Sequence, residues 1–246
     1  MSLCDLTDKK IIITGASSGI GRASAVLASK LGARVVLCGR DEKRISETSS
    51  MLEGSGHSTF LFDIADFEIY PSIFDKIVLD GKKLDGMLHC AGIAEAVPMR
   101  IMKYEQIKKI MDINFASFIL LTAIYSKKKY SDGGSIVGIS AVNAHYPQKC
   151  MSIYAASKAA IEASVRTAAL ELADKQIRIN CVTPGVVDTP MGNNSANIKE
   201  IARNQLLGIS KAEDIAKIAI FLLSDASSVI TGRAIYADGG MLGQSI

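Results

Sequence analysis

Short apolar runs alternate with longer amphipathic segments along nearly the whole chain, and this alternation constrains the fold more than any other feature. Near-continuous apolar strands separated by helices are typical of a parallel sheet that is covered on both faces. We therefore expect an α/β fold: one doubly wound domain over residues 1–246, with a parallel sheet of about seven strands and helices on both faces. The apolar runs are 10–14, 33–38, 58–62, 86–90, 135–140, 177–182 and 234–237.

Composition excludes several other classes of protein. The net charge is only +3 and no basic block is present, so we expect no nucleic-acid partner. The first residues lack the apolar core of a signal peptide, and no apolar run reaches the ~20 residues that span a bilayer, so we expect no membrane contact. The five scattered cysteines form no CxxC pair and share no ligand spacing with the three histidines. We expect a cytoplasmic protein with reduced thiols and no metal.

Polar and glycine-rich residues follow directly after six of the apolar runs. TGASSGIG follows the first run, and TPGVVDTPM lies at the end of the sixth. Because the carboxyl ends of parallel strands meet at one edge of the sheet, these segments should converge on one crevice, where such folds bind ligands.

The glycine turn after the first run is the first candidate binding element. Gly15, Gly19 and Gly21 allow a tight turn and a close approach to a ligand. The next helix directs its free N–H groups and positive dipole end at this point, which favours a pyrophosphate. The same turn fits the G-x-S-x-G pattern of hydrolases through Ser17, but a hydrolase needs a late histidine, and the last one is His145.

Tyr154 and Lys158 are the candidate acid/base pair. They stand at positions i and i+4 of a predicted helix, so both side chains lie on one face. A free tyrosine has a pKa near ~10, and we expect a nearby ammonium to lower that pKa. The alternative interpretation is a core tyrosine beside a surface lysine.

These motifs, TGASSGIG, YAASK and PGVVDTPM, together resemble the short-chain dehydrogenase/reductase family over essentially the whole chain, from Lys10 to about Gly240. The resemblance implies a Rossmann fold, a nicotinamide cofactor and hydride transfer between that cofactor and a carbonyl or alcohol. It implies catalytic roles for Tyr154 and Lys158, and for Asn114 as the residue that holds a water in the proton relay. The cofactor-binding residues that it implies are Gly15, Ser17, Gly19, Ile20, Gly21, Asp63, Ala91, Gly92, Tyr154, Lys158, Pro184, Gly185, Val187 and Thr189.

Two departures from the family pattern bear on the cofactor site. His89 and Cys90 replace two asparagines that usually brace the sheet, which we interpret as a structural variation. NAD enzymes of the family place an acid after the second strand, whereas this chain has Gly39 followed by Arg40. A guanidinium suits a 2′-phosphate, so NADP(H) is favoured over NAD(H). The family's other NADP signal is missing, because Ser18 stands where a basic residue would be; Arg40 as a solvated loop residue is the alternative.

The third departure concerns the serine that holds the substrate oxygen. The family places it thirteen residues before the tyrosine, and here that residue is Ala141. Ser140 is the neighbouring candidate, but adjacent strand residues point to opposite faces, so it replaces the missing serine only through a one-residue bulge or a loop insertion. Other candidate donors in the same loop are Asn143, His145 and Ser152.

Two functions follow from these residues. The first is a working reductase with a shifted or weakened contact to the substrate oxygen, for which the resemblance points to a 3-oxoacyl-[acyl-carrier-protein] reductase. The second is an NADPH-binding protein of low turnover, acting as a sensor or structural subunit. The partner is a small-molecule or carrier-bound carbonyl substrate, with a lid at about 191–209, and the resemblance implies a homotetramer.

Overall fold

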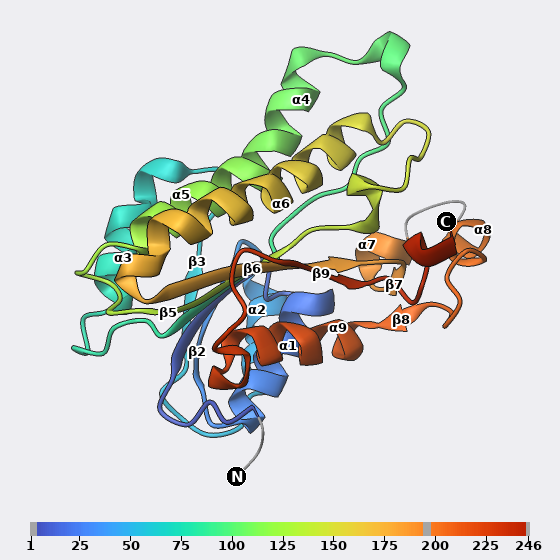
Figure 1. Cartoon of the computed structure of the whole chain (residues 1–246). Helices are drawn as coiled ribbons and strands as arrows, with labels where there is room; N and C mark the ends of the chain where they lie inside the picture. The colour runs from blue at the N-terminus through green and yellow to red at the C-terminus, as the bar shows by residue number, and fades with distance from the viewer. Residues whose placement is uncertain (1–3, 194–197, 245–246) are drawn as a thin grey trace.

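A computed structural model describes residues 4–193 and 198–244 (Figure 1). Seven strands form one parallel sheet in the order β3-β2-β1-β4-β5-β6-β9. The strands are β1 (Lys10–Thr14), β2 (Arg34–Gly39), β3 (Ser58–Leu61), β4 (Gly86–His89), β5 (Gly134–Ile139), β6 (Ile177–Pro184) and β9 (Ala234–Ala237). This sheet confirms the predicted doubly wound fold.

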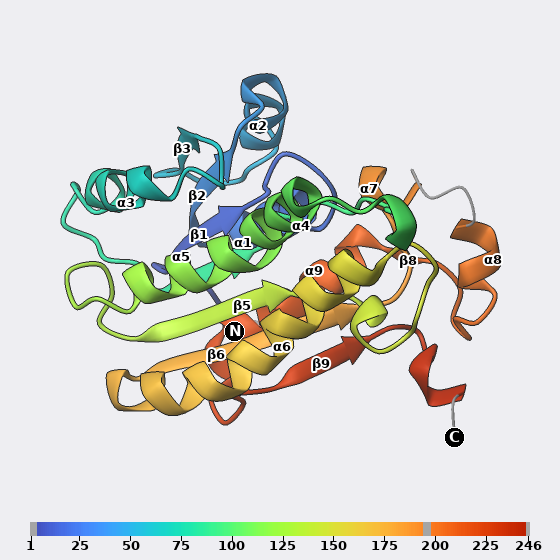
Figure 2. The same ribbon diagram turned by 90° about the horizontal axis from the view of Figure 1, so that it is seen from above.

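Helices cover both faces of the sheet (Figures 1 and 2). The helices on one face are α1 (Gly19–Lys30), α2 (Glu42–Ser49) and α9 (Ala212–Leu223). Those on the other face are α3 (Tyr70–Ile77), α4 (Tyr104–Met111), α5 (Ser117–Tyr125) and α6 (Ser152–Leu172). Short 3₁₀ turns include Phe67–Ile69, Met99–Ile101, Val142–Ala144, Ala173–Lys175, Asp225–Ser227 and Leu242–Gln244.

Strand residues alternate between the two cores because successive side chains of a strand point to opposite faces. In β1, Ile12 packs with Phe118 of α5 and Ile161 of α6. Ile11 and Ile13 instead join the core formed with α1 and α9. All three isoleucines are at most 1% exposed, which explains why the run reads as continuously apolar.

The strand order reverses between β1 and β4, so the loops after these two strands diverge and leave a crevice. Further loops beyond the sheet carry β7 (Val187–Asp188), α7 (Pro190–Asn193), α8 (Ile198–Ala202) and β8 (Ser210–Lys211). The short strands β7 and β8 pair with each other in parallel. The lid expected at 191–209 falls in this region, although residues 194–197 lie outside the described part of the chain.

A five-residue π-helical turn, Asp112–Ala116, joins α4 to α5. Such turns widen the helix locally and often occur at functional sites. Here the turn contains Asn114, which is fully buried and faces the end of β4.

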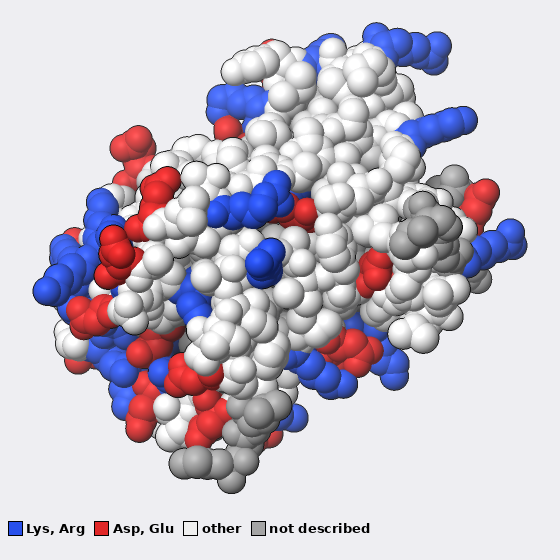
Figure 3. Space-filling view, viewed as in Figure 1, with Lys and Arg blue, Asp and Glu red and all other residues white. Residues whose placement is uncertain are grey.

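The distribution of surface charge and the lengths of the helices can be read from the structure. Acidic and basic side chains are interspersed on the left and lower parts of the visible face in Figure 3, so neither sign dominates there. Among the helices described, none combines the length and apolar character that a membrane crossing requires.

Candidate active site

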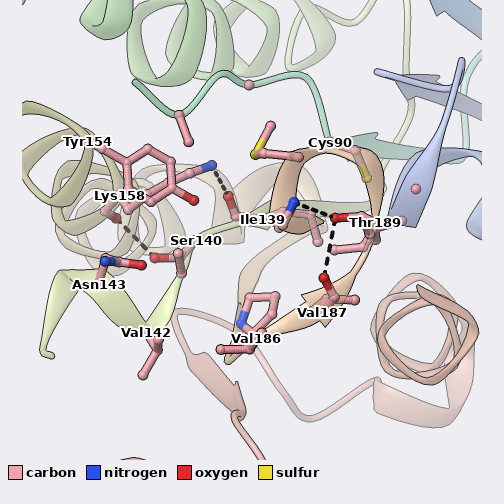
Figure 4. Close-up of a pocket in the computed structure, with 18 of the residues that line it drawn as sticks. Cys90, Ile139, Ser140, Val142, Asn143, Tyr154, Lys158, Val186, Val187 and Thr189 are labelled. Atoms are coloured by element: carbon pink, nitrogen blue, oxygen red, sulfur yellow. Dashed lines mark hydrogen bonds between the residues drawn. The ribbon is translucent and has the colours of Figure 1, made fainter. Parts of the chain in front are cut away.

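A cavity of about 400 Å³ lies at the carboxyl ends of the strands, and it brings together most of the predicted site residues (Figure 4). Of those residues, the ones that line it are Gly15, Ser17, Gly19, Ile20, Gly21, Ala91, Gly92, Ser140, Tyr154, Lys158, Pro184, Gly185, Val187 and Thr189. Sequence reasoning did not single out several other lining residues, among them Ala94, Ala96, Val142, Gln148, Met151, Val186 and Ile201.

Three predicted residues do not line this cavity. Arg40 is exposed and directly follows β2, whose last residue Gly39 pairs with Leu61 of β3. Asp63 follows β3, and its carboxylate accepts a hydrogen bond from the backbone N–H of Ala65 at 2.9 Å. Both therefore lie at the ends of neighbouring strands, at the same edge of the sheet as the glycine turn after β1. The third residue, Asn114, lies behind the cavity wall.

The glycine turn is shaped by close backbone contacts. Gly15 has φ +64° and Gly19 has φ +51°, a region in which side-chain-bearing residues are strained. A Cβ on Gly15 would lie 2.7 Å from the backbone nitrogen of Ala91, so the turn packs directly on the loop after β4. A Cβ on Gly19 would lie 3.1 Å from the Thr189 methyl group. Glycine is needed here for both conformation and space.

The N-terminus of α1 fits a phosphate group. Its N-cap residue, Ser18, makes no side-chain capping hydrogen bond, and the first turn contains no acidic residue. The free N–H groups of this turn therefore lack a capping partner from the described residues, and they carry the positive end of the helix dipole. Ser18, Ile20 and Gly21 line the same cavity, so these donors suit the pyrophosphate of a dinucleotide.

Tyr154 and Lys158 occupy successive turns at the start of α6 and are 8% and 6% exposed. The Lys158 ammonium lies 5.7 Å from the centre of the Tyr154 ring and donates a 2.7 Å hydrogen bond to the carbonyl oxygen of Ile139 (Figure 4). The Tyr154 hydroxyl has no hydrogen-bond partner within the described part of the chain. Its proton is therefore available to an oxygen bound in the cavity.

Burial decides the pKa of both groups. It lowers the pKa of Lys158 to about 8, because a charged ammonium is poorly solvated there. It raises the pKa of Tyr154 to about 12. The lowered tyrosine pKa expected from the sequence is therefore not found: the pKa of Tyr154 is raised, because burial removes the solvation of the phenolate.

Asn114 holds the loop after β4 against α6, the helix of Tyr154 and Lys158. Its amide oxygen accepts from the Ile93 N–H at 2.8 Å, and its amide nitrogen donates to the Ile93 carbonyl at 2.9 Å. The same nitrogen donates to the Ser157 hydroxyl at 3.0 Å. Ser157 in turn donates to the carbonyl oxygen of Tyr154. Asn114 thus connects the loop beside the cavity to the backbone of the candidate acid.

His89 braces the sheet, in agreement with its interpretation as a structural variation. Its Nδ1 lies 3.0 Å from the Thr14 hydroxyl and its Nε2 lies 3.2 Å from the Ser117 hydroxyl. Ser117 already donates to the Ile113 carbonyl, so it accepts from Nε2–H, and Nδ1 accepts from Thr14. The Thr14 oxygen accepts from the N–H of Ala91, on the cavity wall. Burial lowers the pKa of His89 to about 3, which keeps the ring neutral.

The position of the missing serine is Ala141, which is 8% exposed and lines the cavity. Ser140 also lines it, but its hydroxyl lies 2.8 Å from the Glu162 carboxylate and 3.1 Å from the Lys158 carbonyl oxygen. A hydroxyl has one proton to donate, and the buried carboxylate takes it. Ser140, a predicted catalytic residue, is therefore not available to donate to a substrate oxygen. No bulge turns it toward Tyr154, because β5 keeps a regular register with β6 up to Ile139.

Glu162 is the centre of a buried polar cluster that sequence reasoning missed. Its carboxylate accepts from Ser140 and, at 2.7 Å, from Thr183, and it pairs with His145 at 2.7 Å. The Tyr236 hydroxyl lies 3.2 Å from the same His145 nitrogen. A signal was present in the sequence: Glu162 follows Lys158 by four residues, as Lys158 follows Tyr154, so an acidic residue extends the buried face of the helix.

A doubly wound sheet with an open glycine turn, and a tyrosine–lysine pair in the adjoining cavity, define a dinucleotide-binding α/β oxidoreductase. A family model described as enoyl-(acyl carrier protein) reductase matches residues 15–242. The chain belongs to the short-chain dehydrogenase/reductase family, and membership implies an oxidoreductase that uses a nicotinamide cofactor.

Relatives with known names agree with this family. The chain is 31% identical to the 3-oxoacyl-[acyl-carrier-protein] reductase of Thermotoga maritima, over 96% of this chain and 99% of that protein. It is 30% identical to the L-xylulose reductase of Caenorhabditis elegans, over 96% of each chain. Among solved structures, a short-chain dehydrogenase/reductase of Mycobacterium ulcerans superimposes with a TM-score of 0.89 at 28% identity, covering 97% of this chain and 91% of that one.

Proposed function

We propose that the protein is an NADP(H)-dependent reductase of a carbonyl group, with a 3-oxoacyl thioester as the substrate class. The observation that carries this proposal is the position of Tyr154 and Lys158 in a cavity continuous with the uncapped N-terminus of α1. The free N–H groups of α1 would hold the pyrophosphate of the cofactor, and Tyr154 and Lys158 line the same cavity, where its nicotinamide would supply a hydride. Reduction then needs only a proton donor beside the carbonyl oxygen.

Tyr154 is the proton donor of the proposed reaction. The bound nicotinamide supplies a hydride, and the carbonyl oxygen takes its proton from the Tyr154 hydroxyl. With a pKa of about 12, the tyrosine carries this proton at neutral pH, which suits the direction of reduction. Lys158 is fixed by Ile139 near the ring, where a charged ammonium stabilises the phenolate that remains. Asn114 positions the loop and helix that frame the pair.

The preference for NADP(H) rests on the end of β2. Gly39 offers no carboxylate to the ribose hydroxyls, and a Cβ there would lie 2.8 Å from the Ile45 side chain. Arg40 follows as an exposed guanidinium that has no ion-pair partner among the described residues. A planar guanidinium binds a phosphate through paired hydrogen bonds, so it suits a 2′-phosphate. Arg40→Ala should weaken NADPH binding more than NADH binding in parallel titrations.

The substrate class rests on the walls of the cavity. Among the described residues that line it, Lys158 alone carries a charge. The apolar side chains that line it include Ala94, Ala96, Val142, Met151, Val186 and Ile201. Apolar walls favour an uncharged aliphatic substituent on the carbonyl. The name of the Thermotoga maritima relative supports a 3-oxoacyl chain, and that of the Caenorhabditis elegans relative supports a sugar ketone as the comparison substrate.

A second function is supported by the lack of a hydroxyl at Ala141 and by the hydrogen bond that the Ser140 hydroxyl donates to Glu162. Loss of a donor to a developing oxyanion costs roughly 10²–10³ in rate. If no other group replaces it, the protein binds NADPH and turns over slowly, as a sensor or structural subunit.

The experiment that separates the two functions measures NADPH binding and NADPH oxidation on the same protein. The carbonyl panel contains an acetoacetyl thioester, a sugar ketone and an aromatic ketone. Saturable oxidation with the thioester supports the reductase. Tight NADPH binding without oxidation of any member supports the low-turnover function, and failure to bind either nicotinamide cofactor rejects both.

Assembly and location extend this proposal. Leu120 of α5 and Leu170 of α6 are 40% and 81% exposed, while Val229 and Tyr236, before and in the edge strand β9, are 93% and 50% exposed. Two separate apolar surfaces suit a homotetramer with two kinds of interface.

The lid at 191–209 would close the cavity through residues such as Met191 and Ile201. All five cysteines are free, which suits a reducing cytoplasm. Light scattering and cell fractionation test these points.

A further inference from the structure

The amide of Asn143 has an unusual environment for a polar group. It belongs to the 3₁₀ turn Val142–Ala144, directly after Ala141, and lines the same cavity as Tyr154. Its Nδ2 is buried, yet it has no hydrogen-bond partner among the described residues. A buried amide N–H without an acceptor destabilises the folded state, so such groups are uncommon and call for an explanation.

The other donors of this loop that the sequence analysis named are already engaged or misplaced. Ser140 donates its proton to Glu162 at 2.8 Å, and His145 pairs with the same carboxylate at 2.7 Å. Ser152 is exposed and does not line the cavity. Asn143 is the remaining candidate donor that the sequence analysis named. It lines the cavity, and its Nδ2 has no hydrogen-bond partner among the described residues.

The position of Asn143 suits an oxygen that is also bound by Tyr154. Figure 4 shows the side chains of Asn143, Ser140 and Tyr154 together at one end of the cavity, with Val186 and Val187 on the other side. A half-turn of the amide about its last side-chain bond exchanges Nδ2 and Oδ1 without changing its shape. In Figure 4 the oxygen of the amide points toward Ser140 and its buried Nδ2 points away, so this half-turn is needed to bring the N–H to the cavity side, where it can donate to a carbonyl oxygen.

We propose that Asn143 replaces the missing serine and donates its amide N–H to the substrate carbonyl oxygen, opposite the Tyr154 hydroxyl. This inference rests on the proposed reductase function. The apolar residues Ala141 and Val142 directly precede Asn143 and line the same cavity, and a less polar environment strengthens a hydrogen bond to a developing negative charge. The unpartnered amide is then a donor that is satisfied only when substrate is bound.

The first test measures turnover of an acetoacetyl thioester with NADPH. Asn143→Ala should lower kcat by roughly 10²–10³, the loss typical of one oxyanion donor. The double variant Ala141→Ser with Asn143→Ala should recover part of the lost rate, because it restores a hydroxyl at the family's position.

Gln148 provides the comparison variant, because it is a second amide that lines the cavity. If Gln148→Ala loses the rate and Asn143→Ala does not, the proposal is overturned in favour of Gln148. Retention of kcat within a factor of about two in Asn143→Ala likewise overturns it. NADPH titration and urea unfolding of each variant show whether a loss reflects cofactor binding or folding.

A second measurement separates this proposal from the reductase function. The acetoacetyl thioester is titrated into the protein saturated with NADP⁺, which has no hydride to give, and its Kd is measured by calorimetry. Asn143→Ala should weaken this Kd at least several-fold and leave the NADP⁺ Kd unchanged. If the native protein shows no turnover but binds the thioester through Asn143, the reductase function fails and the Asn143 site stands. If the native protein and Asn143→Ala give the same Kd, or neither binds, the Asn143 site is rejected.

Discussion

The Lys158 ammonium donates a 2.7 Å hydrogen bond to the carbonyl oxygen of Ile139, the last residue of β5. This bond fixes the side chain across the floor of the cavity, with its charge 5.7 Å from the centre of the Tyr154 ring. The ammonium is held in a buried place by one neutral acceptor, and its pKa falls to about 8. The Lys158 side chain therefore loses its proton at a pH only slightly above neutral.

Cofactor binding should depend on pH because of this lysine. The pKa of Lys158 is lowered, so the side chain loses its proton as pH rises through about 8, well below the ordinary range for lysine. A cofactor that favours the ammonium should then bind more weakly above pH 8, by up to about tenfold per pH unit. NADPH titrations between pH 6.5 and 9.5 measure this. Lys158→Met should bind weakly at every pH; a flat profile in the native protein contradicts the prediction.

Tyr154→Phe removes the proposed proton donor and keeps the ring. We expect NADPH binding within about twofold of native, because the hydroxyl has no hydrogen-bond partner among the described residues to lose. Reduction of the thioester should fall by roughly 10²–10⁴, the usual contribution of a general acid. Single-turnover absorbance at saturating substrate measures the chemical step. Native-like turnover in Tyr154→Phe would assign the proton to another group.

His89 should make the protein sensitive to acid. Its folded-state pKa is about 3, below the ordinary 6.5, so its contribution to stability is complete above pH 6.5 and is lost as pH falls toward 3. The unfolding free energy should drop by up to about 1.4 kcal/mol per pH unit over this range from this group alone. In His89→Asn, which does not titrate, urea unfolding between pH 7 and 4 should show a shallower slope. Parallel slopes in the two proteins would assign the acid sensitivity elsewhere.

Glu162→Gln should destabilise the folded protein. One carboxylate oxygen accepts from Ser140 and Thr183 and the other pairs with His145, so an amide removes the charge of these bonds and replaces one accepting oxygen with an NH₂ group. Each buried polar group left unpaired costs about 1–3 kcal/mol. Glu171→Gln is the matched control, because Glu171 is on the same helix and exposed, and it should change stability by less than about 0.5 kcal/mol. Urea unfolding at pH 7 compares them, and equal stability would mean that the cluster rearranges.

Gly39→Asp should shift the cofactor preference toward NADH. A carboxylate at the end of β2 accepts from ribose hydroxyls and repels a 2′-phosphate. The new Cβ would lie 2.8 Å from the end of the Ile45 side chain, so the single variant should also lose stability. Adding Ile45→Val should recover part of that loss without changing the preference. The ratio of NADPH to NADH Kd values decides the matter, and an unchanged ratio rejects Gly39 as the selecting position.

The sequence by itself determined the class of fold and the place of the site. Alternating apolar runs and helical segments encode the parallel sheet, because a strand buried on both faces must be apolar throughout. The rule that ligands bind at the carboxyl ends of such strands then brought the glycine turn, Tyr154 and Lys158 to one cavity. These features depend on residues that are near one another in the chain, so the sequence alone is enough to predict them.

Only the tertiary structure decided how the polar groups are paired. The proton of Ser140 goes to Glu162, twenty-two residues further along the chain, and the Nδ2 of Asn143 is left without a partner among the described residues. The pKa of Tyr154 rises instead of falling, because packing removes water from its hydroxyl. Such outcomes depend on which atoms meet when helix α6 packs on the sheet, and on the solvent that this packing excludes. Spacing along the chain fixes the face on which a side chain lies, but not the partner that it meets there.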